Sequence, residues 1–274
     1  MKKIGVAISG YNKLDEILTN INIIRNHWSE KSVFLSICCN DPTTLERLKG
    51  ENIDSLVLGV DYKKDQFSEP KAWLRMRQYD TIKKSVLQAA KNSEYTIQWH
   101  SDAYALYSQT VVDMASFMKE NNKLVAFRGK WRNDISTKRP VGHTDDHFIL
   151  FNSSHVLNTN LLSEGDQVEH IKRVAGTWSC EGIMCYLISS HTPDENIWHY
   201  DDMRENIVDK KFYPENPEAP VDPYYKDGVA HCAIPPFNFD PNRKFLHSDL
   251  WSHTERFFKE SGVPTSLIRR SEHL

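Results

Sequence analysis

Apolar residues follow two different periods along the first half of the chain. Residues 4–9 and 33–39 form short apolar runs of the length of a buried strand. Leu14, Ile17 and Ile21 then recur at helical spacing between these two runs. Later segments repeat the order of strand and helix. This alternation predicts an α/β fold with a mostly parallel sheet and crossover helices.

Helix-capping residues and changes in the hydrophobic period predict where the other helices and strands begin and end. Asn12, with Asp15 three residues later, is expected to cap the first helix, and Asp41-Pro42 is expected to open a short helix that ends near Gly50. Ser108 is expected to cap a later helix. The remaining strands are predicted at residues 55–60, 95–99, 124–128 and 147–151, and the remaining helices at residues 71–91 and 179–189.

The chain after residue 190 has a different composition. It holds nine of the twelve prolines, which predicts irregular backbone. It is also rich in aromatic residues, which a disordered segment would lack. We therefore predict two halves of one domain, an α/β half at 1–155 and a second half at 156–274, whose irregular C-terminal extension packs on the same domain.

Composition and charge exclude several classes of protein. A hydrophobic share of 39% and a formal net charge of -3 indicate a globular chain without the basic excess that duplex nucleic acid usually requires. No apolar stretch approaches the roughly 20 residues of a membrane helix, and the apolar run at 4–8 is too short for a signal peptide. Five cysteines without a CxxC pair suggest neither a disulfide framework nor a zinc site. We expect a cytoplasmic protein.

Polar residues gather where the predicted strands end. These segments are Ser9-Gly10-Tyr11-Asn12, Asn40-Asp41, Gly59-Val60-Asp61 and His100-Ser101-Asp102. Loops at the carboxyl ends of parallel strands are where such folds bind ligands. Helix capping is the alternative role for Asn12 and Asp41, and the two roles are compatible because helix-terminal amides also attract phosphate.

His100 and Asp102 form the most specific of these segments. They lie two positions apart, directly after an apolar strand, so an extended backbone places both on one face. A divalent cation that bridges phosphates usually takes one or two oxygen ligands from the protein. The alternative is a solvated loop in which Asp102 stabilises a turn.

Two segments carry a resemblance to a known family. AISGYNKLDEILTNINIIR resembles the opening of GT-A glycosyltransferases, in which a strand ends in a TYN turn before an amphipathic helix. NSEYTIQWHSDAYAL is similar to the strand that leads into the Asp-x-Asp motif of that family, with His100 in place of the first acid and Asp102 in place of the second. The resemblance covers roughly residues 3–130.

The resemblance implies a fold and an activity. The fold is a three-layer α/β/α sandwich, with the nucleotide-sugar site at 1–155 and the acceptor side at 156–274. The activity is transfer of a hexosyl or related sugar from a nucleotide-diphosphate sugar to the hydroxyl of a glycan or another acceptor. The implied donor-binding residues are Ser9, Gly10, Tyr11, Asn12, Asp41, Arg77, Ser101 and Asp102, with Arg75 as the neighbour of Arg77.

The resemblance also implies a metal and a catalytic base. Mn or Mg would be held by Asp102 and His100, and a late histidine, His231 or His247, would add a contact. Glu181 would be the base of an inverting transfer, because family members carry a carboxylate near this point. Its alternative is a glutamate that the helix dipole favours in a first turn. Asp146 and its neighbour Asp145 compete for the role of base, or shape a loop before the strand at 147–151.

Two other functions share the same residues. His-x-Asp with a distant histidine is also the ligand set of non-haem Fe(II) oxygenases of the 2-oxoglutarate type, with His231 as the third ligand. Those enzymes are built on antiparallel barrels, which the alternating pattern does not predict. A module that binds a nucleotide or glycan without turnover is the third hypothesis, because His100 replaces an acid.

Overall fold

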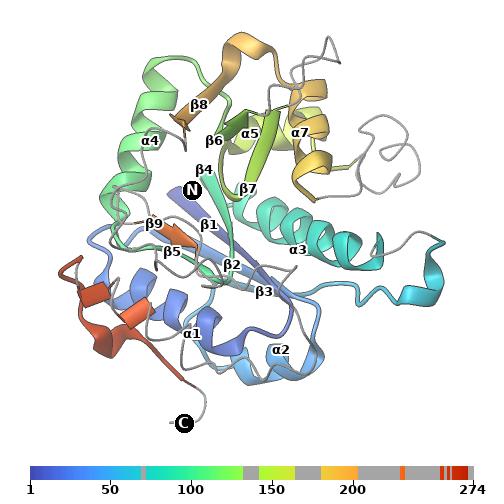
Figure 1. Cartoon of the computed structure of the whole chain (residues 1–274). Coiled ribbons are helices and arrows are strands. Elements are labelled where there is room, and N and C mark those ends of the chain that lie inside the picture. Colours follow the sequence, from blue (N-terminus) through green and yellow to red (C-terminus); the bar gives the residue numbers. More distant parts are fainter. Residues whose placement is uncertain are drawn as a thin grey trace, which may run out of the picture. The chain divides into compact units, whose positions relative to one another are not determined.

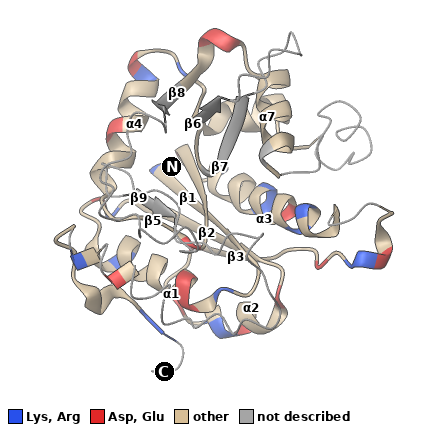
Figure 2. Cartoon of the chain, viewed as in Figure 1, with Lys and Arg blue, Asp and Glu red and all other residues tan. Residues whose placement is uncertain are grey.

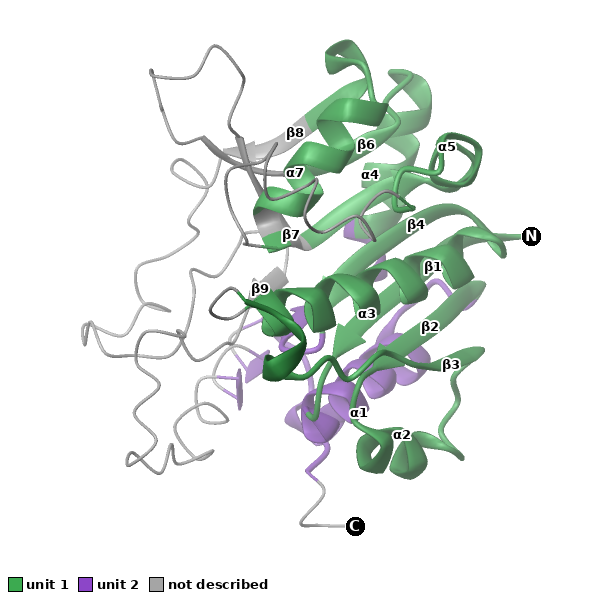
Figure 3. Cartoon of the chain, turned by 90° about the vertical axis from the view of Figure 1, so that its right-hand side faces the viewer, with its two compact units in different colours: residues 1–12, 32–100, 111–203 green, residues 13–31, 101–110, 204–274 purple. Residues whose placement is uncertain are grey.

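The computed structural model describes residues 1–68, 72–131, 142–163, 180–202, 229–231, 254–255, 258–259 and 261–270. These residues belong to two compact units whose segments interleave along the chain (Figure 3). Unit 1 comprises Met1–Asn12, Ser32–His100 and Val111–Met203, and unit 2 comprises Lys13–Lys31, Ser101–Thr110 and Arg204–Leu274. The sequence analysis predicted two continuous halves, at 1–155 and 156–274, rather than interleaved units. The assignment of these halves to donor binding and acceptor binding stays a prediction.

A seven-stranded sheet runs through unit 1 in the order β3-β2-β1-β4-β7-β6-β8 (Figure 1). Neighbouring strands are parallel, except that β7 is antiparallel to both β4 and β6. The predicted α/β fold with a mostly parallel sheet is therefore confirmed. The strands are β1 (Lys2–Gly10), β2 (Val33–Cys39), β3 (Ser55–Leu58), β4 (Ser93–His100), β6 (Val125–Trp131), β7 (Gly142–Asn152) and β8 (Ile197–Asp202).

Helix α3 (Ala72–Ala90) packs along β1, β2 and β4 and carries the main core of unit 1 (Figure 3). Its buried face includes Tyr79, Ile82 and Val86, in one cluster with Phe151 of β7 and Leu187. Burial of such side chains stabilises the fold by roughly 1.5–3 kcal/mol each. The other helical elements within unit 1 are α2 (Pro42–Leu48), η2 (Lys64–Gln66), α5 (Ser153–Thr159), α7 (Cys180–His191) and η4 (Asp194–Asn196).

Unit 2 is held together around the segment that follows β4. Strand β5 (Ala103–Ala105) pairs antiparallel with β9 (Val229–His231). Helix α1 (Leu14–Asn22) supplies Asn20, whose amide nitrogen donates to the carbonyls of Ser101 and Ala103 at 2.8 and 3.1 Å. These bonds fix the backbone on both sides of Asp102. Unit 2 also holds η1 (Ile23–His27) and η7 (Thr265–Leu267), and α4 (Ser108–Glu120) begins in unit 2 and continues into unit 1.

The helix caps were predicted with mixed success. Asp41 caps α2 as predicted, since its carboxylate accepts from the Thr44 backbone nitrogen at 2.8 Å and from the Thr44 hydroxyl at 2.6 Å. The hydroxyl bond is the main reason why the pKa of Asp41 is lowered. The predicted cap at Asn12 is wrong. Helix α1 begins at Leu14, and Lys13 occupies the cap position without a side-chain capping bond.

Charges of both signs share the helices of unit 1 (Figure 2). Glu46 and Arg47 are neighbours in α2, and in α3 the Lys84 ammonium lies 3.0 Å from the Asp80 carboxylate one turn earlier. This mixing agrees with the absence of a basic excess in the composition. None of the helices in the described ranges is long and apolar enough to cross a membrane.

Gly5 of β1 lies against Ala89, near the end of α3, and against Ser93. A Cβ atom at this position would lie 2.3 Å from the Ser93 hydroxyl and 3.1 Å from the Ala89 Cβ. The Ser93 hydroxyl cannot move away without cost, because it donates to the Ala89 carbonyl at 2.9 Å and bonds Thr96 at 3.1 Å. Only glycine fits this position without displacing the helix or the hydroxyl.

We therefore predict that Gly5→Ala lowers the free energy of unfolding by about 1–3 kcal/mol, as overpacking of a tight core does. Urea denaturation followed by circular dichroism measures this loss. The loss should be smaller in a Ser93→Ala background, since the hydroxyl is the nearest atom. An equal loss in both backgrounds would contradict the steric explanation.

Candidate functional site

Ser9 and His100 are neighbours at the ends of β1 and β4. The parallel ladder pairs the two residues directly, and the Ser9 hydroxyl lies 2.9 Å from the His100 Nδ1 atom. On its other side, His100 Nε2 lies 3.1 Å from the Gln78 amide nitrogen on α3. Gln78 Oε1 in turn accepts from Arg75 at 3.3 Å. A chain of polar contacts, buried at Ser9 and partly buried at Gln78 and Arg75, therefore runs through His100.

This chain assigns the proton on His100. A guanidinium group can only donate, so the Gln78 oxygen faces Arg75 and its NH₂ group faces His100. His100 Nε2 then accepts this bond, which leaves the ring proton on Nδ1 to be donated to the Ser9 hydroxyl. Both ring nitrogens of the neutral imidazole are therefore engaged inside unit 1.

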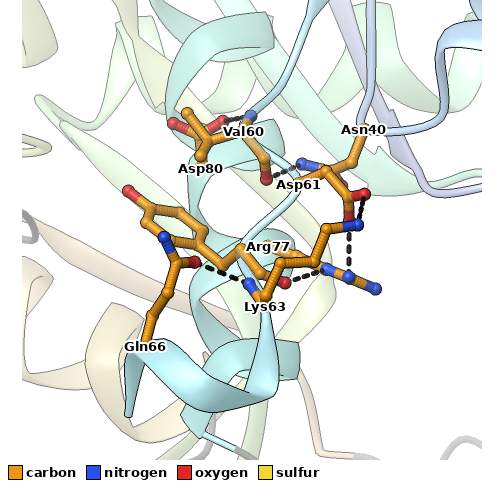
Figure 4. Close-up of polar contacts among 8 residues, drawn as sticks. Asn40, Val60, Asp61, Lys63, Gln66, Arg77 and Asp80 are labelled. Carbon is orange, nitrogen blue, oxygen red and sulfur yellow. Dashed lines mark hydrogen bonds and ion pairs between the residues drawn. The ribbon is translucent and has the colours of Figure 1, made fainter.

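Arg77 holds together two of the strand-end loops predicted to bind a ligand. Its Nε donates to the Tyr62 carbonyl at 2.7 Å, and its Nη2 lies 2.5 Å from Asp61 (Figure 4). The guanidinium carbon lies 4.4 Å from the centre of the Trp73 ring and 4.8 Å from that of Tyr11. Only 11% of the side chain is exposed. Arg77 therefore serves as a clamp, and its predicted contact with a diphosphate stays untested.

The turn after β3 is held by two side chains from neighbouring elements (Figure 4). Asn40 donates to the Val60 carbonyl at 2.8 Å, and Asp80 accepts from the Val60 amide at 2.7 Å. A Cβ atom on Gly59 would lie 2.5 Å from the Asn40 amide nitrogen, so this close approach needs glycine. Sequence reasoning missed Asp80. Its only local signal is the helical spacing to Lys84.

A second group of charged side chains lies within unit 2, and we call Lys13, Glu16 and Asp102 the Lys13 cluster. The Lys13 ammonium forms an ion pair with Asp102 Oδ2. Lys13 keeps 37% of its side chain exposed, whereas Asp102 keeps 10%. Burial raises the pKa of Glu16, Lys13 opposes this shift, and the Asp102 charge adds to it. Sequence reasoning did not single out Lys13 or Glu16.

The described side chains of the predicted metal site do not fit a divalent cation. His100 has both ring nitrogens in hydrogen bonds, and Asp102 already faces the Lys13 ammonium. Across the described residues, no group of three or more His, Cys, Asp or Glu side chains could hold a metal ion. The backbone of His231 pairs with Ala103, one residue beyond Asp102, but its side chain lies outside the description. Binding of Mn or Mg stays a prediction, because the His231 side chain that would complete the site is not described.

The remaining predicted residues fall into three groups. Ser9 and Ser101 are buried, Gly10 ends β1, and Tyr11 and Asn12 are exposed. Glu181 is the second residue of α7. Asp145 and Asp146 lie inside β7, which begins at Gly142. The predicted loop before residue 147 is therefore wrong. The side chains of these three acids lie outside the description, as does the whole of His247.

We predict that Arg77→Lys lowers the free energy of unfolding by about 1–3 kcal/mol, because an ammonium loses the planar contact with two rings and one of two directed bonds. Urea denaturation provides the measurement. Arg75→Lys is the matched control on the same helix and should change stability by less than about 0.5 kcal/mol. If Arg77→Lys lowers the free energy of unfolding no more than Arg75→Lys does, Arg77 does not hold the two loops together.

Comparison with known proteins yields structural matches alone. No protein-family model and no curated protein matches this sequence. Solved structures do match, among them the glycosyltransferase GlyE of Streptococcus pneumoniae TIGR4, with 14% identity and a TM-score of 0.50. That match covers 97% of this chain and 65% of GlyE.

Two further matches are weaker. The apo structure of the bifunctional glycosyltransferase WbbM is 13% identical, with a TM-score of 0.45 over 72% of this chain and 38% of that one. Mouse xyloside xylosyltransferase 1 in its apo form is 11% identical, with a TM-score of 0.39 over 72% of this chain and 85% of that one. This chain thus spans less than two thirds of the length of GlyE and of WbbM. The match to GlyE shows that the chain has a glycosyltransferase fold.

Proposed function

We propose that this chain is a glycosyltransferase that moves a hexosyl or related sugar from a nucleotide-diphosphate donor to an acceptor hydroxyl. The observation that carries the proposal is the edge of the sheet where β3, β2, β1 and β4 end. The parallel register aligns Leu58, Cys39 and Gly10 across three of these strands, and Ser9 with His100 across the last pair. Ligands of open parallel sheets bind outside this edge.

The residues at this edge suit a nucleotide. Tyr11 keeps 38% of its surface exposed while Arg77 holds its ring, so the ring is both fixed and accessible. Asp41 remains partly exposed where α2 begins, and a carboxylate can accept a hydrogen bond from a ribose hydroxyl. Ser9, Gly10 and Asn12 complete the first strand end. A fixed aromatic ring loses little entropy when a base stacks on it.

Chemically, the transfer breaks the bond between the anomeric carbon and the diphosphate oxygen. The acceptor oxygen forms the new bond to that carbon, and its proton passes to a carboxylate base. The departing diphosphate keeps the electron pair of the broken bond, so nearby positive charge lowers the barrier. We assign the base to Glu181 in the first turn of α7, with Asp146 on β7 as the second candidate.

The architecture separates this proposal from its alternatives. An oxygenase with a His100-x-Asp102 ligand set was expected on an antiparallel barrel, whereas the sheet of unit 1 is mostly parallel. A binding module without turnover would share the fold and the strand ends. It differs from an enzyme by the absence of product, so turnover decides between the two.

The first prediction concerns binding of the donor. In a screen of uridine, guanosine, adenosine, cytidine and thymidine diphosphates, at least one should raise the melting temperature, because a ligand at one hundred times its Kd adds about 2.7 kcal/mol to stability. Tyr11→Ala should remove this shift by removing the stacking surface. Tyr107→Ala is the control, since Tyr107 is also 38% exposed. No shift with any nucleotide, with or without Mn, would refute the proposed function.

The second prediction concerns the reaction. With a responsive nucleotide sugar and a panel of glycan acceptors, Glu181→Gln should lower the transfer rate by about 10²–10⁴-fold, the usual contribution of a general base. Donor affinity should be unchanged. The exposed Glu195 offers a control in Glu195→Gln, which should keep the full rate. Nuclear magnetic resonance of the product gives its anomeric configuration, and a configuration equal to that of the donor would rule out an inverting base.

A further inference from the structure

We propose that His155 and His191, together with Thr192, form a pH-sensitive latch that joins the beginning of α5 to the end of α7 and opens when both imidazoles are protonated. All three residues belong to unit 1. The latch is a conformational device of this unit, and it involves neither a sugar donor nor an acceptor.

The latch joins two helices that are distant in the sequence. His155 is the third residue of α5, and its Nε2 atom lies 2.9 Å from the hydroxyl of Thr192, 37 positions later. Thr192 follows His191, the last residue of α7, and its backbone nitrogen donates to the Ile188 carbonyl at 2.9 Å. Val156 of α5 and Ile188 of α7 belong to one buried apolar cluster. The latch therefore adds a polar contact between helices that already share a core.

Each histidine is also held by its own helix. The Asn152 side-chain oxygen caps α5 by accepting from the His155 backbone nitrogen at 3.0 Å. His191 Nδ1 donates to the Leu187 carbonyl at 2.9 Å, because a carbonyl oxygen can only accept. A proton that His191 gains in acid therefore goes to its Nε2 atom. The two rings have fixed positions before either becomes charged.

The surroundings of His155 oppose a positive charge. Both histidines are half-buried, so water screens their charges only in part. Burial is the main reason why the pKa of His155 is lowered, and the charge of the neighbouring His191 lowers it further. Acid therefore brings a second positive charge next to a first one, at the point where the two helices meet.

Other titratable groups around the latch do not compensate for these charges. Helix α5 packs on α3, β4 and β7. The titratable groups on or beside α3 and β4, and in the turn after the latch, include Lys83, Lys91, Glu94, Tyr95, Asp194 and Glu195. Among the described residues, only the charge of His191 contributes to the pKa shift of His155, and no carboxylate forms an ion pair with it.

The direction of the pH effect follows from the lowered pKa. The pKa of His155 is about 6.5 in the unfolded chain and lower in the folded one, so the unfolded chain binds more protons as the pH falls. The stability of the latch is complete above about pH 6.5 and decreases as the pH falls below this value. The beginning of α5 and the end of α7 should open first, because the latch ties these two segments.

Hydrogen exchange followed by mass spectrometry tests the latch in the full chain at pH 7.5 and 5.5, with rates corrected for the intrinsic effect of pH. In peptides that cover residues 153–159 and 183–192, protection should fall at least about threefold at pH 5.5. His155→Gln should abolish this fall, since an amide can bond Thr192 but gains no proton. His27→Gln in unit 2 is the control and should retain it.

Nuclear magnetic resonance titration of the imidazoles tests the histidine pair without altering His155. We expect the pKa of His155 to lie below about 6.5 and to rise in His191→Gln, which removes the neighbouring charge. Equal protection of the two segments at both pH values, or a fall that His155→Gln leaves unchanged, would overturn the latch. An unchanged His155 pKa in His191→Gln would overturn it as well, even if His155→Gln does not fold.

Discussion

The parallel pairing of β1 with β4 is the constraint on which the candidate site depends. Side chains of a strand alternate between faces, so a slip of one residue would turn His100 away from Ser9 and Gln78. Further down β1, only glycine fits at position 5, because a Cβ atom there would clash with Ser93 and Ala89. The close packing of α3 against β1 therefore depends on this glycine.

Arg77 of unit 1 and Lys13 of unit 2 differ in how far their charges are exposed. Arg77 is nearly buried, and its charge is matched by Asp61 and by two aromatic rings, so it stabilises the strand-end loops. Lys13 also has a carboxylate partner, but much of its side chain remains accessible. A charge that is paired and buried contributes order, whereas a charge that is paired and accessible can still meet a ligand. The two ion pairs therefore differ in how much of the cation remains exposed to solvent.

The sequence predicted the features that depend on local pattern. Strands β1, β2 and β4 follow from apolar runs, α3 from its helical period, and the Asp41 cap from the Asp-Pro signal. Short elements such as β5 and β9 carry too few residues for a period to be visible. Lys13 could not be found, because its partner Asp102 lies 89 positions away and no local pattern joins them. The predicted cap at Asn12 also failed, because α1 begins at Leu14 and Lys13 occupies the cap position.

Two side-chain pairs, one at the ends of β1 and β4 and one just after them, show how polarity changes along the chain. Within unit 1, the last paired positions of these strands join the neutral groups Ser9 and His100. Within unit 2, Lys13 and Asp102, four and two residues further on, join opposite charges. Neutral groups that satisfy each other have no reason to attract an anion, whereas an accessible ammonium on a buried carboxylate does. The change from a neutral pair to a charged pair therefore takes place within four residues of Ser9 and two residues of His100.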